Sequence, residues 1–225
     1  EGEVIPLSKY EEVKTPIGEI TLKKWRKAVS AEAIKKSGYN NSVIATDAKL
    51  LKDVQSGIRT SFFGLLNGSI TGSSTVTGSG LQEALANAWA QLQVLFEDDT
   101  AEAVHFLNPL DVAAYLGTAQ ITTQTAFGMS YVEDFLGLGT VILSANVPAG
   151  KYYATAKENI ITYYINVASG DIANSFNLTT DETGYIGINE YPDKDTARVM
   201  DLVMSGVTFF PERQDGIVVG TIAGA

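Results

Sequence analysis

The chain has 225 residues, of which 45% are hydrophobic and 19% charged, so it is long enough to form one large or two small domains with a substantial core. It contains no cysteine, which excludes disulfides, thiolate chemistry and thiolate metal ligands. Its apolar runs are far too short to span a bilayer and no secretory signal is recognisable, so we expect no membrane partner. The sequence begins at Glu1 rather than Met, and we expect that an upstream segment has been removed.

The net charge of −10 is distributed unevenly. Residues 1–60 carry 11 Lys and Arg against 8 Asp and Glu, a net charge of +3, whereas residues 61–225 carry 5 against 18, a net charge of −13. This asymmetry fits either an ordinary solvated surface or a basic front end that lies on the acidic body of a neighbouring subunit. The overall acidity argues against a nucleic-acid site.

The first segment, from Glu3 to about Val29, has the pattern of a β-hairpin. Thr15–Gly18 places Pro and Gly at the second and fourth positions of a type I turn, where each is favoured. The flanking strands carry too few apolar residues for a core, so this hairpin needs a surface to lie on. A short helical turn follows over Ala31–Lys36. Near the end of the hairpin lies the densest basic cluster, whose members we predict to make inter-subunit contacts: Lys23, Lys24, Trp25, Arg26 and Lys27.

One long amphipathic helix is predicted over Asn41–Leu66. We expect Asn40 or Asn41 to cap its start and Asn67–Gly68 to end it. At 1.5 Å per residue it would be roughly 39 Å long, which suggests a structural spine. Its apolar face is built from residues at steps of three and four, with Asp47 in the same phase: Val43, Leu50, Leu51, Val54, Ile58, Phe62 and Leu65.

A stretch rich in Gly, Ser and Thr, Gly68–Gly80, is the best candidate for a flexible boundary in the chain. It is not a phosphate-binding loop, because no Gly-Lys-Ser/Thr follows it. Ser79 and Gln82 form a capping box for a predicted helix over Leu81–Leu95. The inward face of this helix is expected to contain Leu81, Leu85, Ala88, Trp89, Leu92 and Phe96.

The segment from about 81 to 183 has the pattern of a compact α/β unit. Ala103–Leu107 reads as a buried strand, and Asn108–Pro109 opens a helix that runs to Leu116. Further strands are predicted at Val141–Ser144, Tyr152–Ala156 and Ile160–Val167.

The last part contains a predicted strand at Tyr185–Glu190 and a final strand at Ile217–Ile222. Between them, the run Thr196–Phe210 fits strand and helix periods about equally well, although its β-branched finish favours a strand.

The residues that carry chemistry in enzymes form no recognisable set here. His105 is the only histidine, so a His-pair zinc site and a Ser-His relay both lack a partner, and we interpret it as a hydrogen-bonded structural residue. The acidic pairs Asp98/Asp99, Asp181/Glu182 and Asp193/Asp195 lack the calcium-loop pattern and are interpreted as solvated turns. We therefore predict no catalytic residues, no metal site and no cofactor.

The order of these parts resembles that of the major capsid proteins of tailed bacteriophages, which share the HK97-like fold. Residues 1–28, from Glu1–Leu7 to Lys23–Ala28, look like the extended loop of that family. Leu50–Arg59 looks like its spine helix, and Phe209–Glu212 with Gly216–Ile222 is similar to its return to the axial domain. The resemblance implies an α+β fold with an extended loop (1–28), a peripheral domain (29–67 and 185–211) and an axial domain (68–184 and 212–225). The family's crosslinking between Lys and Asn is not carried over, since no local motif would make Lys9 reactive.

The resemblance implies a structural head protein without enzymatic activity. It would assemble with itself, as hexamers and pentamers, into an icosahedral shell around double-stranded DNA. Its further partners would be a scaffolding segment or protein, a portal and, non-specifically, the packaged DNA. It would be located in the virion after assembly in the bacterial host cytoplasm. The alternatives are an encapsulin-like compartment that encloses protein cargo and, more remotely, a carbohydrate-binding or hydrolytic α/β domain.

Overall fold

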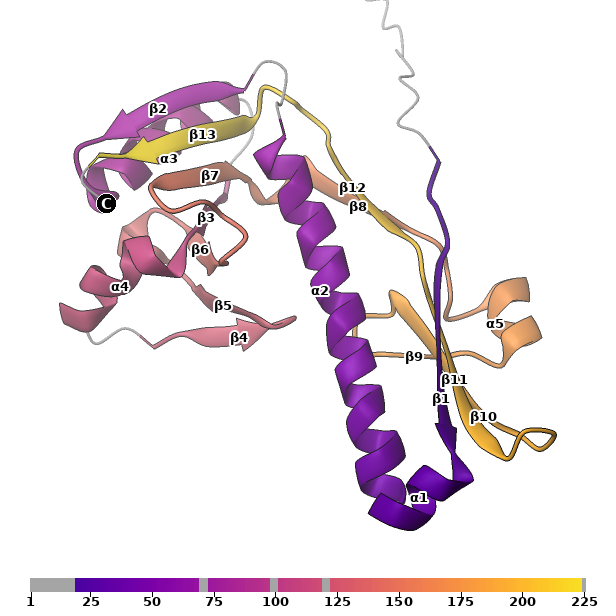
Figure 1. The fold of residues 1–225 in the computed structure, drawn as a ribbon. Coiled ribbons are helices and arrows are strands. Elements are labelled where there is room, and N and C mark those ends of the chain that lie inside the picture. Colours follow the sequence, from indigo (N-terminus) through magenta and orange to yellow (C-terminus); the bar gives the residue numbers. More distant parts are fainter. Residues whose placement is uncertain (1–18, 69–72, 98–100, 119–121, 224–225) are drawn as a thin grey trace, which may run out of the picture.

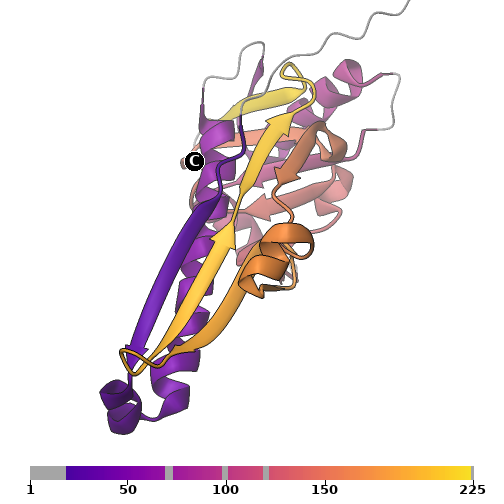
Figure 2. The ribbon, with the colours of Figure 1, turned by 90° about the vertical axis from the view of Figure 1, so that its right-hand side faces the viewer.

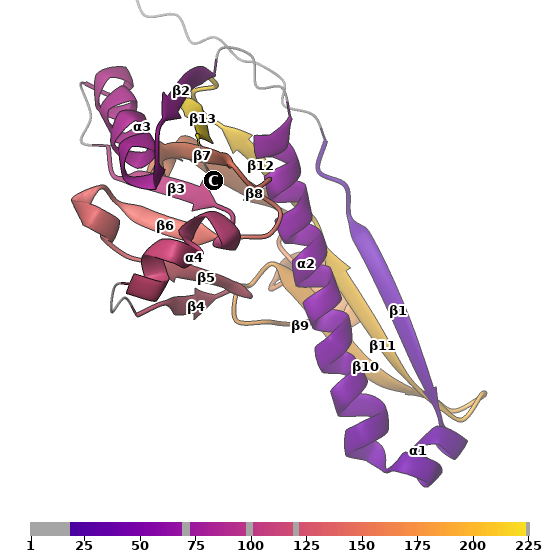
Figure 3. The same ribbon diagram turned by 60° about the vertical axis from the view of Figure 1, so that its left-hand side comes forward.

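The computed structural model describes residues 19–68, 73–97, 101–118 and 122–223. Its strands form a four-stranded sheet, a seven-stranded sheet and a two-stranded ribbon, and one long helix, α2, stands between the two larger sheets (Figures 1 and 3). The helices are α1 (Ala31–Ser37), α2 (Ala45–Asn67), α3 (Leu81–Leu95), α4 (Pro109–Thr118) and α5 (Gly170–Phe176). None of the described helices is both long and apolar enough to cross a membrane.

The four-stranded sheet is antiparallel and has the order β1 (Lys23–Ser30), β11 (Arg198–Ser205), β10 (Ile186–Asp193) and β9 (Thr179–Thr180). Three of its strands are eight residues long and run side by side along the molecule (Figure 2). The N-terminal half of α2 packs on one face of this sheet through Val54, which contacts Ile186 and Val203. A second small core around Val167, Leu178 and Met204 covers the other face.

The spine helix is confirmed, with a start that differs in detail from the prediction. A π-helical turn, Asn40–Ile44, runs directly into α2, and the helix ends at Asn67. Neither Asn40 nor Asn41 caps it. Tyr39 already has helical dihedral angles, so both asparagines lie inside the helical segment, and the Asn41 amide donates to the Ser37 carbonyl instead.

The buried face of α2 changes towards its C-terminal end. Val54 is buried as predicted, but Phe63 and Leu66 are buried where Phe62 and Leu65 were expected. The reason is that α2 meets two surfaces in succession. Its first half packs on the four-stranded sheet, and its second half packs on the seven-stranded sheet through Phe63 and Leu66.

The seven-stranded sheet is mixed. Its order is β2 (Ser74–Gly78), β13 (Ile217–Ile222), β7 (Lys151–Ala156), β3 (Ala103–Leu107), β6 (Thr140–Leu143), β5 (Met129–Val132) and β4 (Gln124–Ala126). The helices α3 and α4 cover one face, where Leu85, Leu92 and Val112 pack on Leu107, Tyr152 and other buried residues. The opposite face carries Val104, Phe106 and Tyr153 towards α2. Alternate residues of each strand therefore serve two cores.

The predicted linker is in part a strand. Residues 74–78 pair in parallel with β13, and their side chains alternate between more and less buried positions. Their β-branched residues favour a strand. Gly78 comes so close to α3 that a Cβ there would lie 2.3 Å from the backbone nitrogen of Ala84. The glycine is thus needed for packing rather than for flexibility.

The helix α3 has the predicted bounds but a different cap and face. The backbone NH of Ser79 donates to the Glu83 carboxylate at 3.0 Å, so Glu83 rather than Gln82 completes the cap. Ala84 is fully buried, whereas Trp89 is 39% exposed. The inward face is turned away from Trp89 towards Ala84 and Leu95, which pack in the core with Leu85, Ala88 and Leu92.

The ambiguous run near the end of the chain forms two strands separated by Gly206. The first is β11, and the second, β12 (Val207–Pro211), pairs with β8 (Ile160–Tyr164) as a two-stranded ribbon beside α2. A Cβ on Gly206 would lie 2.6 Å from the Ile165 side chain, so a larger residue does not fit at this break. The remaining strand predictions in the α/β unit are confirmed, while β4, β5 and α5 were not predicted.

Two segments lie with the four-stranded sheet rather than where the resemblance placed them. Lys23–Ala28, assigned to the extended loop, pairs along β11, with Lys23 opposite Ser205 and Ala28 opposite Met200. The segment that contains α5 and β9, assigned to the α/β unit, covers the outer face of the same sheet. Both differences arise from long-range pairings that sequence periodicity does not reveal. The rest of the predicted hairpin, residues 1–18, lies outside the described residues.

Candidate assembly surface and charged cluster

The five residues of the predicted basic cluster do not form one surface, because they lie on a β-strand. Their side chains alternate between the two faces of the sheet. Trp25 is half-buried against the core that includes Val54, and the Lys27 side chain is only 18% exposed. Lys23, Lys24 and Arg26 are exposed. Sequence reasoning treated the segment as a loop and therefore missed this alternation.

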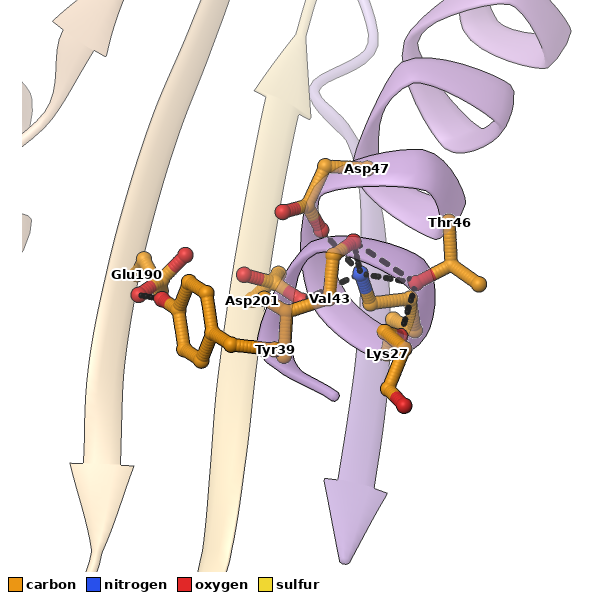
Figure 4. Close-up of polar contacts among 8 residues, drawn as sticks. Lys27, Tyr39, Val43, Thr46, Asp47, Glu190 and Asp201 are labelled. Atoms are coloured by element: carbon orange, nitrogen blue, oxygen red, sulfur yellow. Dashed lines mark hydrogen bonds and ion pairs between the residues drawn. The ribbon is translucent and has the colours of Figure 1, made fainter. Parts of the chain in front are cut away.

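Lys27 is the centre of an internal charged cluster (Figure 4). Its ammonium group makes ion pairs with Asp47 of α2 and, at 2.8 Å, with Asp201 of β11. It also donates to the Thr46 hydroxyl at 2.8 Å and to the Val43 carbonyl at 3.3 Å. One lysine thus joins the edge strand β1, the neighbouring strand and the start of the spine helix.

The strand register explains how these groups meet. On the face of the sheet that carries Lys27, Asp201 lies directly opposite it, and Glu190 of β10 lies directly opposite Asp201. Asp47, Glu190 and Asp201 each bring one carboxylate oxygen to within 4.8 Å of the others. The Tyr39 hydroxyl donates to Glu190. The cluster therefore holds three carboxylates around one ammonium group.

The electrostatic environment of these groups follows from burial and from their mutual distances. Burial raises the pKa of Asp201; Lys27 opposes this rise and the neighbouring Asp47 adds to it. Burial would lower the pKa of Lys27, but the hydrogen bonds and charges of Asp201 and Asp47 outweigh it and raise that pKa. Hydrogen bonding to Glu190 raises the pKa of Tyr39 to about 12, so the phenol stays protonated.

The sequence did contain a signal for this cluster. Asp201 interrupts the run Arg198–Val207 at a position that alternation places inside the sheet, and Asp47 stands in the apolar phase of the spine helix. A carboxylate at an inward position needs a partner of opposite charge. Lys27 is a basic residue at an inward position of a strand and could have been proposed as that partner. Its partners could not be paired from the sequence, because they lie 20 and more residues away.

His105 is confirmed as a structural residue. It is fully buried in β3, and its Nε2 lies 3.2 Å from the Leu138 carbonyl oxygen. Burial lowers the pKa of its imidazole to about 4, so the ring is neutral at physiological pH. Its Nδ1 has no hydrogen-bond partner among the described residues.

The described acidic pairs organise turns, as predicted. Asp181 accepts hydrogen bonds from the Thr183 hydroxyl and, at 3.3 Å, from the backbone NH of Ile186. Asp193 accepts from the backbone NH of Asp195 at 3.1 Å and from Thr196 at 2.6 Å. The pair Asp98/Asp99 lies outside the described residues.

A cavity of about 840 Å³ lies between α2, the seven-stranded sheet and the β8–β12 ribbon. Its floor is apolar, with Phe62, Phe106 and Phe209 in edge-to-face and tilted contact. At its rim, Lys157 pairs with Glu102 at 3.1 Å and Arg59 donates to the Phe127 carbonyl. The described lining contains no His, Cys or Ser, and so no nucleophile with an imidazole base.

No known family model matches the sequence, and no curated protein matches it. Solved structures do match. A chain of the capsid of cyanophage P-SCSP1u is similar to this one, with a TM-score of 0.61 and 6% identity. The similar region covers 98% of this chain and 81% of the cyanophage chain. The SrpI encapsulin of Synechococcus elongatus PCC 7942 is similar to 90% of this chain over 73% of its own, with a TM-score of 0.57 and 14% identity.

A third solved structure, the virus-like particle of Pyrococcus furiosus, is similar to 90% of the chain over 76% of its own, with a TM-score of 0.55 and 15% identity. These likenesses extend over nearly the whole chain, which includes both sheets and the spine helix. The mixed α+β architecture described above is therefore the HK97-like fold found in phage capsids and encapsulins.

Proposed function

We propose that this protein is a structural shell subunit, which works by self-association rather than by catalysis. The observation that carries the proposal is the HK97-like fold, matched over 90–98% of the chain by subunits of assembled shells. In this proposal the four-stranded sheet with α2 is the peripheral domain and the seven-stranded sheet is the axial domain.

The finer proposal is a phage head protein that forms hexamers and pentamers around double-stranded DNA. It is supported by the net charge of −10, because a container built from net-acidic subunits does not bind its genome tightly. A scaffolding protein, a portal and packaged DNA would be its partners, the virion its location and the host cytoplasm its place of assembly. The alternative is an encapsulin-like compartment, since a phage capsid and an encapsulin match with similar TM-scores.

Negative-stain microscopy of the full-length chain, expressed alone, tests the shared part of the proposal. We expect closed shells. A chain that remains a monomer at high concentration would contradict the proposal and favour a carbohydrate-binding or hydrolytic domain. The contents of shells purified from the natural source then separate the two containers: nucleic acid supports the phage head, and a single copurifying protein supports the encapsulin.

The exposed basic residues of β1 remain our candidates for inter-subunit contact. Lys23, Lys24 and Arg26 lie on an edge strand and are exposed, whereas Lys27 holds the protein's own carboxylates. Complementary charge would guide them to the acidic body of a neighbour. Trp25 contributes indirectly, by fixing the strand on the spine helix.

Reversing the charges of Lys23, Lys24 and Arg26 to Glu should slow assembly while the melting temperature of the subunit stays nearly constant, since exposed charges contribute little to folding. The matched control reverses three other exposed lysines, Lys35, Lys36 and Lys49. Equal assembly rates of the two triple variants would show that the β1 cluster has no special role.

A further inference from the structure

The end of the four-stranded sheet near α1 carries more negative than positive charge in a confined space. Lys27, Asp201 and Glu190 form one cross-strand row, and Asp47 reaches it from α2. If all four groups were ionised, the cluster would carry a net charge of −2. Among the described residues, no second Lys or Arg forms an ion pair with these carboxylates.

The carboxylate at the centre of the row is almost completely removed from water. Asp201 is 2% exposed. Its Oδ2 lies 2.8 Å from the Lys27 ammonium nitrogen but accepts no hydrogen bond of good geometry. Glu190 is exposed and accepts from the protonated Tyr39, and Asp47 is partly exposed. The charged and titratable groups that face Asp201 are thus Lys27, Asp47, Glu190 and Tyr39.

A buried carboxyl group that lies close to two other carboxylates and to only one ammonium group is harder to ionise than an isolated one. We propose that Asp201, the buried carboxyl of this cluster, keeps a proton at neutral pH in addition to the charge of the Lys27 ammonium, and that this proton fastens β1 to the first turns of α2. The raised pKa of Asp201, caused first by burial, agrees with this assignment.

The sign of the effect follows from linkage. A carboxyl group that is protonated more readily in the folded than in the unfolded protein stabilises the fold at low pH, and this contribution is lost as the pH rises through its folded pKa. The contact between β1 and α2 should therefore loosen as the pH rises above neutral. Because β1 is an edge strand, this loosening can remain local.

The direct test is carbon-13 NMR of the Asp and Glu carboxyl carbons in the unassembled full-length subunit, titrated from about pH 5 to 9. We expect one carboxyl group to remain protonated at pH 7 and to titrate only above that pH. This transition should vanish in Asp201→Asn and persist in Asp195→Asn, a control in an exposed turn. If every carboxyl group is already ionised at pH 7, the proposal is overturned.

The structural consequence is tested by amide hydrogen exchange over the same pH range, corrected for the intrinsic rate. Protection of Lys23–Ser30 should fall with rising pH in the wild type and stay constant in Asp201→Asn, while β13 is unchanged in both. If the Asn variant does not fold, Glu190→Gln replaces it, because removal of a neighbouring carboxylate reduces the excess negative charge by one. Equal pH dependence of β1 protection in wild type and variant would refute the tether.

Discussion

The substitution Phe63→Ala tests the role of α2 as the element that joins the two sheets. Phe63 is 1% exposed and contacts Phe62 and Phe106 edge-on, with ring centroids 5.2 and 5.9 Å apart. Truncation of a buried Phe costs about 3–5 kcal/mol. With a urea dependence of about 2 kcal/mol per molar, a loss of about 4 kcal/mol lowers the unfolding midpoint by about 2 M.

The two tryptophans allow each part of the molecule to be followed separately. Trp25 reports on the four-stranded sheet and Trp89 on α3, so variants that keep one of them isolate each signal. Because α2 packs on both sheets, Phe63→Ala should lower both midpoints together. Gly57→Ala is the control, since it lies on the same helix with open space around it and should stabilise by up to about 1 kcal/mol.

A shift of the Trp89 signal alone would refute the reasoning, because it would mean that the two sheets unfold independently in spite of their common helix. A total cost below about 1 kcal/mol would show that Phe63 is not part of a packed core.

Three further substitutions test other parts of the structure. Lys27→Met should cost about 2–4 kcal/mol in urea unfolding at pH 7, because it removes the ammonium group that pairs with both Asp47 and Asp201; a cost below about 1 kcal/mol would contradict this role. Since burial lowers the pKa of His105 to about 4 from 6.5, the unfolded chain takes up a proton first as the pH falls, and stability should decline by up to about 3 kcal/mol between those values; His105→Gln should lack this part of the decline in melting temperature. Gly220→Ala should cost about 2–3 kcal/mol, because the new Cβ would lie 2.0 Å from the ring of the fully buried Tyr152, and a melting temperature equal to that of the wild type would place Tyr152 elsewhere.

Local periodicity predicted those elements that keep the same packing surroundings along their whole length. The strand Ala103–Leu107 is buried throughout because both its faces are covered, and the bounds of α3 follow from its amphipathic pattern. The buried face of the C-terminal half of α2 was predicted wrongly, because this half packs on a second sheet. There Phe63 is buried instead of Phe62. A single stripe drawn along a straight helix does not reveal such a change of surface.

Pairings between distant strands could not be predicted, because alternation specifies faces and not partners. The pairing of β1 with β11 placed Lys27 inside the molecule, so the predicted patch of five residues is reduced to three exposed charges. The linker prediction failed for a related reason. Ser, Thr and Gly at 74–78 resemble a loop in isolation and become a strand only beside β13.

The two sheets share a feature of chain order that bears on how the protein is made. The four-stranded sheet needs β11 to cover β1, and in the seven-stranded sheet β13 is inserted between β2 and β7. Neither sheet can be completed until residues 198–222 have left the ribosome. At about 5–20 residues per second, α2 waits for more than about 7 s with its apolar face uncovered. Both sheets therefore close only after most of the chain has been made, and chains released before residue 222 expose unpaired strand edges that favour aggregation.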